Sequence, residues 1–317
     1  MYELKIKYLY KMKKYIAKPF IKWVGGKTQL LSTIENLLPS NFINLENLTY
    51  IEPFIGGGAM LFFMLQRFPN IEKAVVNDLN PDLVRAYSTV KNMPESLVVA
   101  LNQIQKEFLS INEEENRKEF YLNIRQRFNE GNLSDIDNTT YFIFLNKTCF
   151  NGLYRVNSKG QFNVPFGRYK NPTICDSETI YADSELLQKV EIINGDFEKT
   201  EKYVTERTFV YFDPPYRPLD ATSSFNSYAK EGFNDDEQIR LKRYFDRLTR
   251  KKCLMMLSNS DCRGKNPKDT FFDDLYKDYI IERVYASRFV NSNPEKRGKL
   301  TELLIRNYQD TKINFLF

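Results

Sequence analysis

The sequence predicts an α/β protein with a doubly wound, mostly parallel sheet and an inserted helical domain. Short apolar strands alternate with helices on both sides of residues 81–146, which is typical of a parallel sheet. Within residues 81–146 the apolar residues recur at helical spacing instead, which predicts about four helices. With 317 residues, 42% of them hydrophobic, the chain can bury a sizeable core as one large domain or as one domain with an insertion.

The first predicted part of the sheet is a strand, a glycine loop and a helix. A strand at residues 50–52 leads into the three glycines at 56–58, and an apolar helix follows. Glycines let a ligand approach the backbone closely, and an acidic residue about 20 positions later suits a ribose. Asp78, after a predicted strand at 74–76, stands at that spacing from Gly58. A dinucleotide site and a simple tight turn are the alternatives, although the loop lacks the G-x-G-x-x-G spacing of dinucleotide sites.

The rest of the sheet is predicted from apolar, β-prone runs. These runs lie at residues 191–193, 208–212, 253–257, 280–286 and 300–305. The last two are joined by a short loop, which predicts an antiparallel hairpin at one end of the sheet. A helix is predicted at 235–248, with Asn234 as its N-cap.

The helical insertion is predicted to end in a basic hairpin. The turn sequence Asn-Ser-Lys-Gly at 157–160 lies between β-prone segments. Residues 138–175 hold five basic residues and no acidic one, as expected of a surface that approaches phosphates. We therefore expect a sheet domain at 19–80 and 176–317 and an insertion at 81–175 with its hairpin at 150–170. The six lysines of residues 1–18 predict a loosely attached basic extension or a frayed terminus.

The composition excludes several kinds of chemistry. The chain has no histidine and its four cysteines form no C-x-x-C pair, so no metal site built on these residues is expected. Nucleophilic catalysis that needs a neutral imidazole is also excluded, which leaves carboxylates, aromatic rings and the backbone. No apolar run approaches the ~20 residues that cross a bilayer. We expect a soluble cytoplasmic protein with neither a membrane partner nor a metal.

The sharpest motif is Asp213-Pro214-Pro215-Tyr216, directly after the predicted strand at 208–212. Ligands bind outside the carboxyl ends of strands in such sheets. Asp213 and the Pro214 carbonyl are acceptors for the two hydrogens of an amino group, and Pro215 keeps the preceding residue extended. Tyr216 offers a face for a base, and such stacking returns roughly the few kcal/mol that extracting the base from a duplex costs. The alternative is a plain turn after a buried strand.

Two further segments carry residues suited to ligand binding. Trp23 and Lys27 lie beside a glycine pair, ahead of an amphipathic helix. A core tryptophan and a solvated lysine are the alternative reading of that segment. Asp196 and Phe197 follow another predicted strand, where the carboxylate can accept from an amino group and the ring can pack on a base. An ordinary turn is the alternative there.

Together these motifs resemble the Dam family of DNA adenine methyltransferases, which includes the GATC-modifying enzymes of restriction systems. The resemblance runs from about residue 18 to residue 308 in the same motif order. It implies a Rossmann-like class I methyltransferase fold. It also implies methyl transfer from S-adenosylmethionine to adenine N6 in duplex DNA, with S-adenosylhomocysteine as product, base flipping and a 5'-GATC-3' site. A cognate restriction endonuclease is the implied partner in function, without physical contact.

The resemblance assigns roles to individual residues. Asp213, Pro214, Pro215 and Tyr216 form the implied catalytic motif. The residues implied to contact S-adenosylmethionine are Trp23, Lys27, Phe54, Gly56, Gly58, Asp78, Asp196, Phe197 and Asp213.

The resemblance also implies a set of DNA contacts. Arg155 is expected to read a guanine, since arginine can bind O6 and N7 together, and Leu153 and Pro165 are expected against a thymine methyl. Lys22 is implied at the outer guanine and Asn151 near the target base. The residues expected on phosphates are Arg168 and Lys170, with Arg288, Lys296, Arg297 and Lys299 from the last hairpin. Solvated basic residues on loops are the alternative.

Other functions stay open at this point. Cytosine-N4 methyltransferases usually carry serine at the position of Asp213, and protein-glutamine methyltransferases usually carry asparagine, so the aspartate favours adenine. An RNA adenine-N6 methyltransferase is a closer alternative. A sequence-specific DNA-binding protein without catalysis belongs to a different class, but it would not need the motif from Asp213 to Tyr216 or the cofactor residues.

Overall fold

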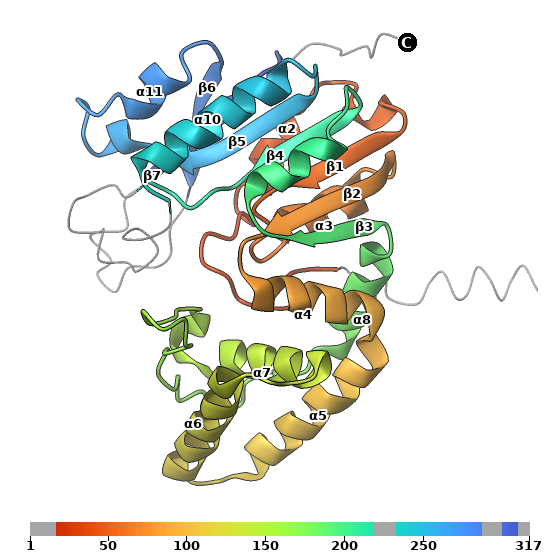
Figure 1. Cartoon of the computed structure of the whole chain (residues 1–317), viewed down its shortest axis with the longest axis vertical. Coiled ribbons are helices and arrows are strands. Elements are labelled where there is room, and N and C mark those ends of the chain that lie inside the picture. Colours follow the sequence, from red (N-terminus) through yellow and green to blue (C-terminus); the bar gives the residue numbers. More distant parts are fainter. Residues whose placement is uncertain (1–16, 218–232, 287–299, 310–317) are drawn as a thin grey trace, which may run out of the picture. The chain divides into compact units, whose positions relative to one another are not determined.

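The computed structural model describes residues 17–217, 233–286 and 300–309. They form two compact units (Figure 1). The described residues of the first, here called the helical unit, are 17–26, 57–62 and 85–188. The second, the sheet unit, contains 27–56, 63–84 and the described residues from 189 onward.

The described residues of the sheet unit form one seven-stranded sheet in the order β3-β2-β1-β4-β5-β7-β6. These strands are β1 (Leu48–Glu52), β2 (Ile71–Asp78), β3 (Val190–Asn194), β4 (Thr208–Phe212), β5 (Leu254–Ser260), β6 (Ile280–Ala286) and β7 (Leu300–Arg306). The first five in this order are parallel, and β7 runs antiparallel to both β5 and β6. The predicted fold class and the predicted terminal hairpin are therefore confirmed.

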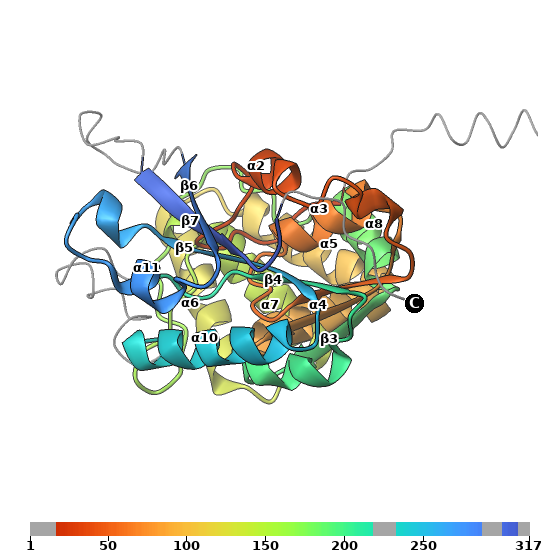
Figure 2. The ribbon, with the colours of Figure 1, turned by 90° about the horizontal axis from the view of Figure 1, so that it is seen from above.

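The centre of the sheet is apolar on both faces. Every residue of β4 and of β5 is buried, as expected of strands that helices cover on both sides. The sheet unit also contains α2 (Leu31–Asn36), η1 (Phe42–Asn44), η3 (Phe197–Tyr203), α10 (Asp235–Thr249), η5 (Cys262–Gly264) and α11 (Phe271–Leu275). In Figure 2, α10 and α2 lie against opposite faces of the sheet.

The packing of α10 follows from its sequence. Asn234 caps its first turn by accepting from the Glu237 N–H at 3.0 Å, which confirms the predicted N-cap. Its apolar side buries Leu241 and Phe245 in the same cluster as the sheet residue Val210. This packing fixes one face of the strands whose ends carry the candidate site.

The helical unit contains most of the predicted insertion. Its helices include α5 (Pro94–Ser110), α6 (Glu114–Glu130), α7 (Asp135–Thr148), η2 (Phe150–Gly152) and α8 (Ser177–Leu187). Two more helices, α3 (Ala59–Arg67) and α4 (Pro81–Asn92), contribute residues to both units. The four helices α4 to α7 match the number predicted for residues 81–146. Most of α7 is buried, and Phe144 in α7 contacts Phe108 of α5 and Tyr121 of α6.

The predicted basic hairpin has a regular turn but irregular arms. The Asn157 N–H donates to the Gln161 carbonyl at 2.8 Å, which closes the turn. Its arms form only isolated bridges, at Cys149 with Phe166 and at Val156 with Phe162, among the described residues. A side chain of α6 replaces the partner strand at Phe162. The Asn129 amide donates to the Phe162 carbonyl and accepts from the Phe162 N–H. The arm is thus held by a helix more than by a partner strand.

Three segments group with the helical unit although the predicted bounds placed them in the sheet domain, namely residues 19–26, residues 57–62 and α8. The Lys18 N–H donates to Asp183 of α8 at 3.0 Å, and the Ser184 hydroxyl donates to the Lys91 carbonyl at 3.1 Å. Such bonds across long sequence separations hold residues 17–26 and α8 in this unit. Apart from Ala17 and Lys18, the predicted extension lies outside the described residues. No helix in the described part of the chain is long and apolar enough to span a membrane.

We predict that Asp183→Asn makes the stability of the protein less dependent on pH. Burial raises the pKa of Asp183 to about 8, whereas an unfolded aspartate titrates near pH ~4. The folded form therefore keeps a proton that the unfolded form loses, and the free energy of unfolding falls as pH rises between these two values. Asparagine can still accept from the Lys18 N–H and carries no charge. Urea denaturation at several pH values should show a flatter profile for the variant and a larger stability near the upper value. Identical slopes for both proteins would contradict the assignment.

Candidate active site

The candidate site of the sheet unit lies where four parallel strands end. Phe54, Asp196 and Asp213 lie in the loops after β1, β3 and β4, and Asp78 is the last residue of β2. Because parallel strands end at the same edge of a sheet, these four predicted residues share one edge. Each loop has its own set of anchoring contacts.

Asp213 follows β4 and is held through one of its carboxylate oxygens. The Lys27 ammonium lies 3.0 Å from Oδ1, and the Ser258 hydroxyl donates to the same oxygen at 2.9 Å. Burial raises the pKa of Asp213 above its usual value, and the Lys27 ammonium opposes this shift. Lys27 is only 5% exposed, so the alternative of a solvated lysine does not hold. The carboxylate and the ammonium form one ion pair, in which Lys27 is buried and Asp213 is half-buried.

Tyr216 belongs to the same cluster and contacts Glu302, a residue that the sequence did not predict. Its hydroxyl donates to Glu302 at 2.7 Å, and the Lys27 ammonium lies 4.3 Å from the centre of its ring. Glu302 is buried in β7, and its carboxylate also lies 3.8 Å from the Lys27 ammonium. An acidic residue beside the apolar run at 303–305 of the predicted strand was the only sequence signal for Glu302. The ammonium therefore lies between two carboxylates.

The loop after β1 is tied to the end of β2. Gly56 adopts a positive φ of 48°, and its N–H donates to Asp78 at 3.1 Å. The second oxygen of Asp78 accepts from the Asn80 N–H at 3.0 Å. Burial raises the pKa of Asp78, and these backbone bonds oppose the shift. The Asn77 amide also links the loop after β1 to the loop after β3, since it donates to the carbonyls of Pro53 and Gly195, each at 2.9 Å.

The loop after β3 presents an acid beside aromatic rings. Phe197 lies 5.4 Å from Phe54, centre to centre. Arg240 of α10 binds both oxygens of Asp196, at 2.6 and 3.1 Å, and stacks 4.1 Å from the centre of the Phe197 ring. These bonds hold the pKa of Asp196 below its ordinary value. Arg240 is thus a second neighbour of the candidate site that the sequence did not reveal.

Trp23 and Gly58, two further predicted cofactor residues, belong to the helical unit. The indole of Trp23 stacks on Tyr154, with 5.5 Å between ring centres. Gly58 has a positive φ of 74°, and a Cβ at this position would collide with the Tyr87 hydroxyl. A close approach of side chains therefore requires glycine at position 58.

The predicted base readers lie on the surface of the helical unit. Arg155 is exposed, and its Nε donates to the Asn163 side chain at 2.7 Å. Asn151 and Pro165 are also exposed, whereas Leu153 is half-buried. The Arg155 guanidinium is thus oriented by a neighbour in the opposite arm of the hairpin.

Lys22 shares an anchor with this hairpin. The buried Asn146 side chain accepts from the Lys22 N–H and donates to the Lys22 carbonyl, each at 2.8 Å. The same amide nitrogen donates to the Gly152 carbonyl at 3.1 Å. Asn146 was not predicted, and only its polarity at the end of an apolar helix indicated a special position. One buried amide therefore fixes the main chain of two predicted reading elements.

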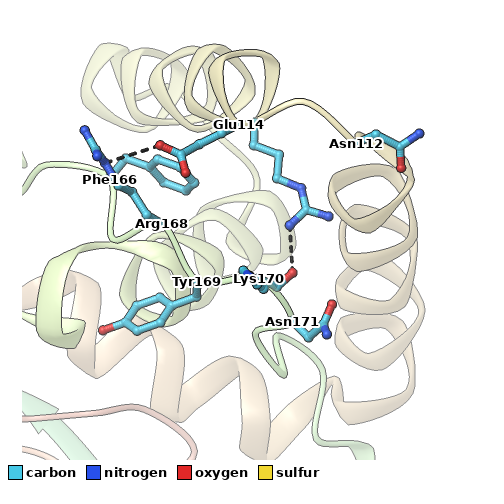
Figure 3. Close-up of a pocket in the computed structure, with 8 residues that line it drawn as sticks. Asn112, Glu114, Phe166, Arg168, Tyr169, Lys170 and Asn171 are labelled. Atoms are coloured by element: carbon cyan, nitrogen blue, oxygen red, sulfur yellow. Dashed lines mark hydrogen bonds and ion pairs between the residues drawn. The ribbon is translucent and has the colours of Figure 1, made fainter.

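The two predicted phosphate-binding residues of the hairpin line a cavity of about 370 Å³ in the helical unit (Figure 3). Its lining residues are Asn112, Glu114, Arg117, Phe166, Arg168, Tyr169, Lys170 and Asn171. The exposed Arg168 lies 3.5 Å from the Glu114 carboxylate, and Arg117 donates to the Lys170 carbonyl at 2.7 Å. The predicted residues Arg288, Lys296, Arg297 and Lys299 lie outside the described residues. The described ranges also contain no cluster of three or more His, Cys, Asp or Glu side chains that could hold a metal ion.

One family model and several known proteins match most of this chain. Residues 23–289 match the family described as D12 class N6 adenine-specific DNA methyltransferase. The type II methyltransferase M.MjaIII of Methanocaldococcus jannaschii is 48% identical over 92% of this chain and 99% of its own length. The type II methyltransferase M1.LlaDCHI of Lactococcus lactis subsp. cremoris is 42% identical over 92% and 95%. The DNA adenine methylase of Escherichia coli K12 is 31% identical over 90% and 94%.

We predict that Lys27→Met raises the pKa of Asp213 further. Loss of an ammonium in contact with a carboxylate removes a stabilisation of its charged form, typically equivalent to roughly 1 to 3 pKa units. Carboxyl carbon NMR of aspartate-labelled protein measures this pKa, with Asp213→Asn used to assign the signal. Lys189→Met is the control, since the Lys189 ammonium instead donates to the Ile71 carbonyl at 2.8 Å. An unchanged pKa in Lys27→Met would contradict the ion pair.

Proposed function

The chain belongs to the D12 class of N6 adenine-specific DNA methyltransferases, and on this premise we propose how it acts. It transfers a methyl group from S-adenosylmethionine to the N6 nitrogen of an adenine in duplex DNA. The target adenine lies within 5'-GATC-3' and leaves the helix before the reaction. The protein acts on this DNA in the cytoplasm.

The observation that carries this proposal is the setting of Asp213. Lys27 and Ser258 both engage Oδ1, and Oδ2 receives no hydrogen bond from the described residues. Oδ2 can therefore accept from an amino group. The lone pair of adenine N6 is delocalised into the ring, so acceptors on both amino hydrogens favour the pyramidal nitrogen that attacks a methyl group. Asp213 and the Pro214 carbonyl are the two acceptors, and the Tyr216 ring is the stacking face.

The residues at the other strand ends fit S-adenosylmethionine. The Asp78 carboxylate lies where a ribose hydroxyl is commonly bound, after the second strand of such sheets. The half-buried Phe54 ring, packed against the buried Phe197, offers an apolar face to an adenine ring, and Asp196 keeps lone pairs for its amino group beside Arg240. Gly56 and Gly58 are required by the backbone conformation of the loop. When bound, the cofactor supplies a methyl group made electrophilic by its sulfonium.

Specific reading of DNA is assigned to the helical unit. Arg155 reads a guanine through the guanidinium edge that Asn163 leaves available, and Leu153 and Pro165 contact a thymine methyl. Lys22 contacts the outer guanine, while Asn151 lies near the target. Arg168 and Lys170 bind phosphates, which adds affinity without sequence information. The exposure of Arg155, Pro165 and Lys22 supports these roles.

Two of the relatives carry the name type II methyltransferase. Their names support the further proposal that this chain protects DNA from a restriction endonuclease of the same system. The partnership requires only a shared recognition sequence and no complex between the two proteins.

We predict that Asp213→Ala abolishes methyl transfer and leaves cofactor binding measurable. The substitution removes one of the two acceptors, while Asp78 and Phe197 stay in place. Tritiated-methyl transfer to duplex DNA and to RNA of the same sequence measures activity and substrate class together. Isothermal calorimetry with S-adenosylmethionine measures binding. Wild-type turnover in the variant would refute the catalytic role, and preferential transfer to RNA by the wild type would refute DNA as the substrate.

We predict that Arg155→Ala and Lys170→Ala have different effects on DNA binding. Loss of a bidentate contact to guanine typically removes ~1–3 kcal/mol of discrimination, so Arg155→Ala should bind cognate and singly mismatched duplexes with more similar affinity. Lys170→Ala should weaken binding to every sequence by a similar factor and reduce its salt dependence. Fluorescence anisotropy at several salt concentrations measures both effects. Equal losses on cognate and mismatched duplexes for Arg155→Ala would remove it as a base reader.

A further inference from the structure

A buried polar side chain lies on the apolar side of α10. Gln238 is only 1% exposed, and the other buried residues of the helix are Leu241, Tyr244, Phe245 and Leu248. Burying a primary amide is unfavourable unless its polar atoms find partners. The position of Gln238 therefore calls for a specific set of hydrogen bonds.

Gln238 finds these partners in the predicted catalytic motif and in β5. Its side-chain nitrogen donates to the Pro215 carbonyl at 3.1 Å. Its side-chain oxygen accepts from the amide nitrogen of Asn259 at 3.1 Å, and Asn259 is fully buried. The oxygen of Asn259 in turn accepts from the Arg217 N–H at 3.3 Å. The two side chains form a chain of hydrogen bonds, here called the amide relay.

The amide relay holds the backbone on both sides of Tyr216. Pro215 is held through its carbonyl and Arg217 through its N–H. The Ser260 hydroxyl adds a third bond, since it donates to the Arg217 carbonyl at 2.7 Å. These contacts are separate from those of Asp213, which is anchored by Lys27 and Ser258. The segment from Pro215 to Arg217 thus has its own attachment to α10 and β5.

The direction of the bonds requires two amides. The nitrogen of Gln238 must donate to a carbonyl while its oxygen accepts from Asn259. A carboxylate at position 238 could accept from Asn259 but could not donate to Pro215. A leucine of similar size would fill the space and would leave the Pro215 carbonyl and the Asn259 amide without these partners.

We propose that Gln238 and Asn259 are positioning residues for methyl transfer. The amide relay fixes the Tyr216 ring and the adjoining backbone where an extruded adenine must stack. The role rests on the proposed function, because it presumes that this motif holds the target base. Neither side chain contacts the base itself.

The first test compares Gln238→Leu with the wild type. The rate constant of a single turnover is measured with saturating S-adenosylmethionine and GATC duplex. Misplacement of a reacting group by about 1 Å can lower a rate about 100-fold, and a loss approaching this size is expected. The dissociation constant for S-adenosylmethionine should be unchanged, because the relay does not contact Asp78 or Phe197. The result should therefore be a change in the chemical step alone.

Leu241→Ala is the matched control for lost stability. Leu241 lies one turn further along α10 and is fully buried, so its truncation loosens the same helix without touching the relay. Its melting temperature should fall, while its rate constant per cofactor-competent molecule should stay near that of the wild type. If Leu241→Ala and Gln238→Leu both lost rate in proportion to the fall in their melting temperatures, the role of Gln238 would be structural and the proposal would be overturned.

A second variant, Gln238→Glu, tests the direction of the bonds. A protonated glutamate has the same shape as glutamine, since its hydroxyl can donate to Pro215 and its carbonyl can accept from Asn259. The ratio of the variant rate to the wild-type rate should therefore rise as pH falls, and the ratio for Gln238→Leu should not. The charged groups nearest Gln238 in α10 are Asp235, Asp236, Glu237, Arg240 and Lys242, and those beside its partners in sequence include Asp213, Arg217 and Asp261. The wild type shares all of them, so the ratio isolates position 238.

The outcomes separate the two proposals. An active wild type with an unaffected Gln238→Leu rate removes the amide relay and leaves the proposed function intact. A wild type that methylates no duplex DNA removes both. A slow Gln238→Leu with normal cofactor affinity, together with acid rescue of Gln238→Glu only, supports the relay.

Discussion

The candidate site of the sheet unit is organised around one carboxylate, Asp213, at the end of a buried strand. Burial disfavours the charge of Asp213, and the Lys27 ammonium and the Ser258 hydroxyl offset this effect at a single oxygen. The ammonium is itself stabilised by Glu302. Three segments far apart in the sequence therefore meet around one charge, and none of them can move without affecting the others.

The sheet order explains how these segments meet. Because β7 inserts antiparallel beside β5, Glu302 pairs in register with Ser260, two residues beyond Ser258. The parallel strands β1 to β4 bring their loops to the same edge by topology alone. Asn77 then connects two of these loops through its amide, at Pro53 and at Gly195. The parallel strands collect the candidate residues at one edge, and the antiparallel strand β7 supplies Glu302, a second carboxylate beside the Lys27 ammonium.

Much of this organisation could be predicted from the sequence because it depends on local patterns. The strands, the capped helix α10 and the four helices α4 to α7 follow from apolar periodicity and capping residues. The motif from Asp213 to Tyr216 could be located because its residue types are rare together. Its position after β4 then followed from the strand pattern.

The missed residues are partners chosen by tertiary structure. Glu302, Arg240, Asn146 and Gln238 bind residues that are 86, 44, 124 and 23 positions away respectively. No local pattern identifies such a partner. The arms of the basic hairpin were predicted as β-prone, but side chains of α6 take the backbone bonds that a regular ladder would use. The bounds of the two units likewise depend on bonds such as that between Lys18 and Asp183.

The bonds of Asn146 to Lys22 have a consequence for evolution. At position 22, Asn146 forms hydrogen bonds only with the main chain, so almost any residue type there could form the same bonds. The stem of Lys22 passes over Gly152, where a Cβ would collide with it, so glycine at 152 keeps room for a long side chain. If Lys22 reads a base as proposed, the residue at 22 can be exchanged without altering the main-chain bonds of Asn146, so the recognised sequence can change while this part of the backbone stays the same.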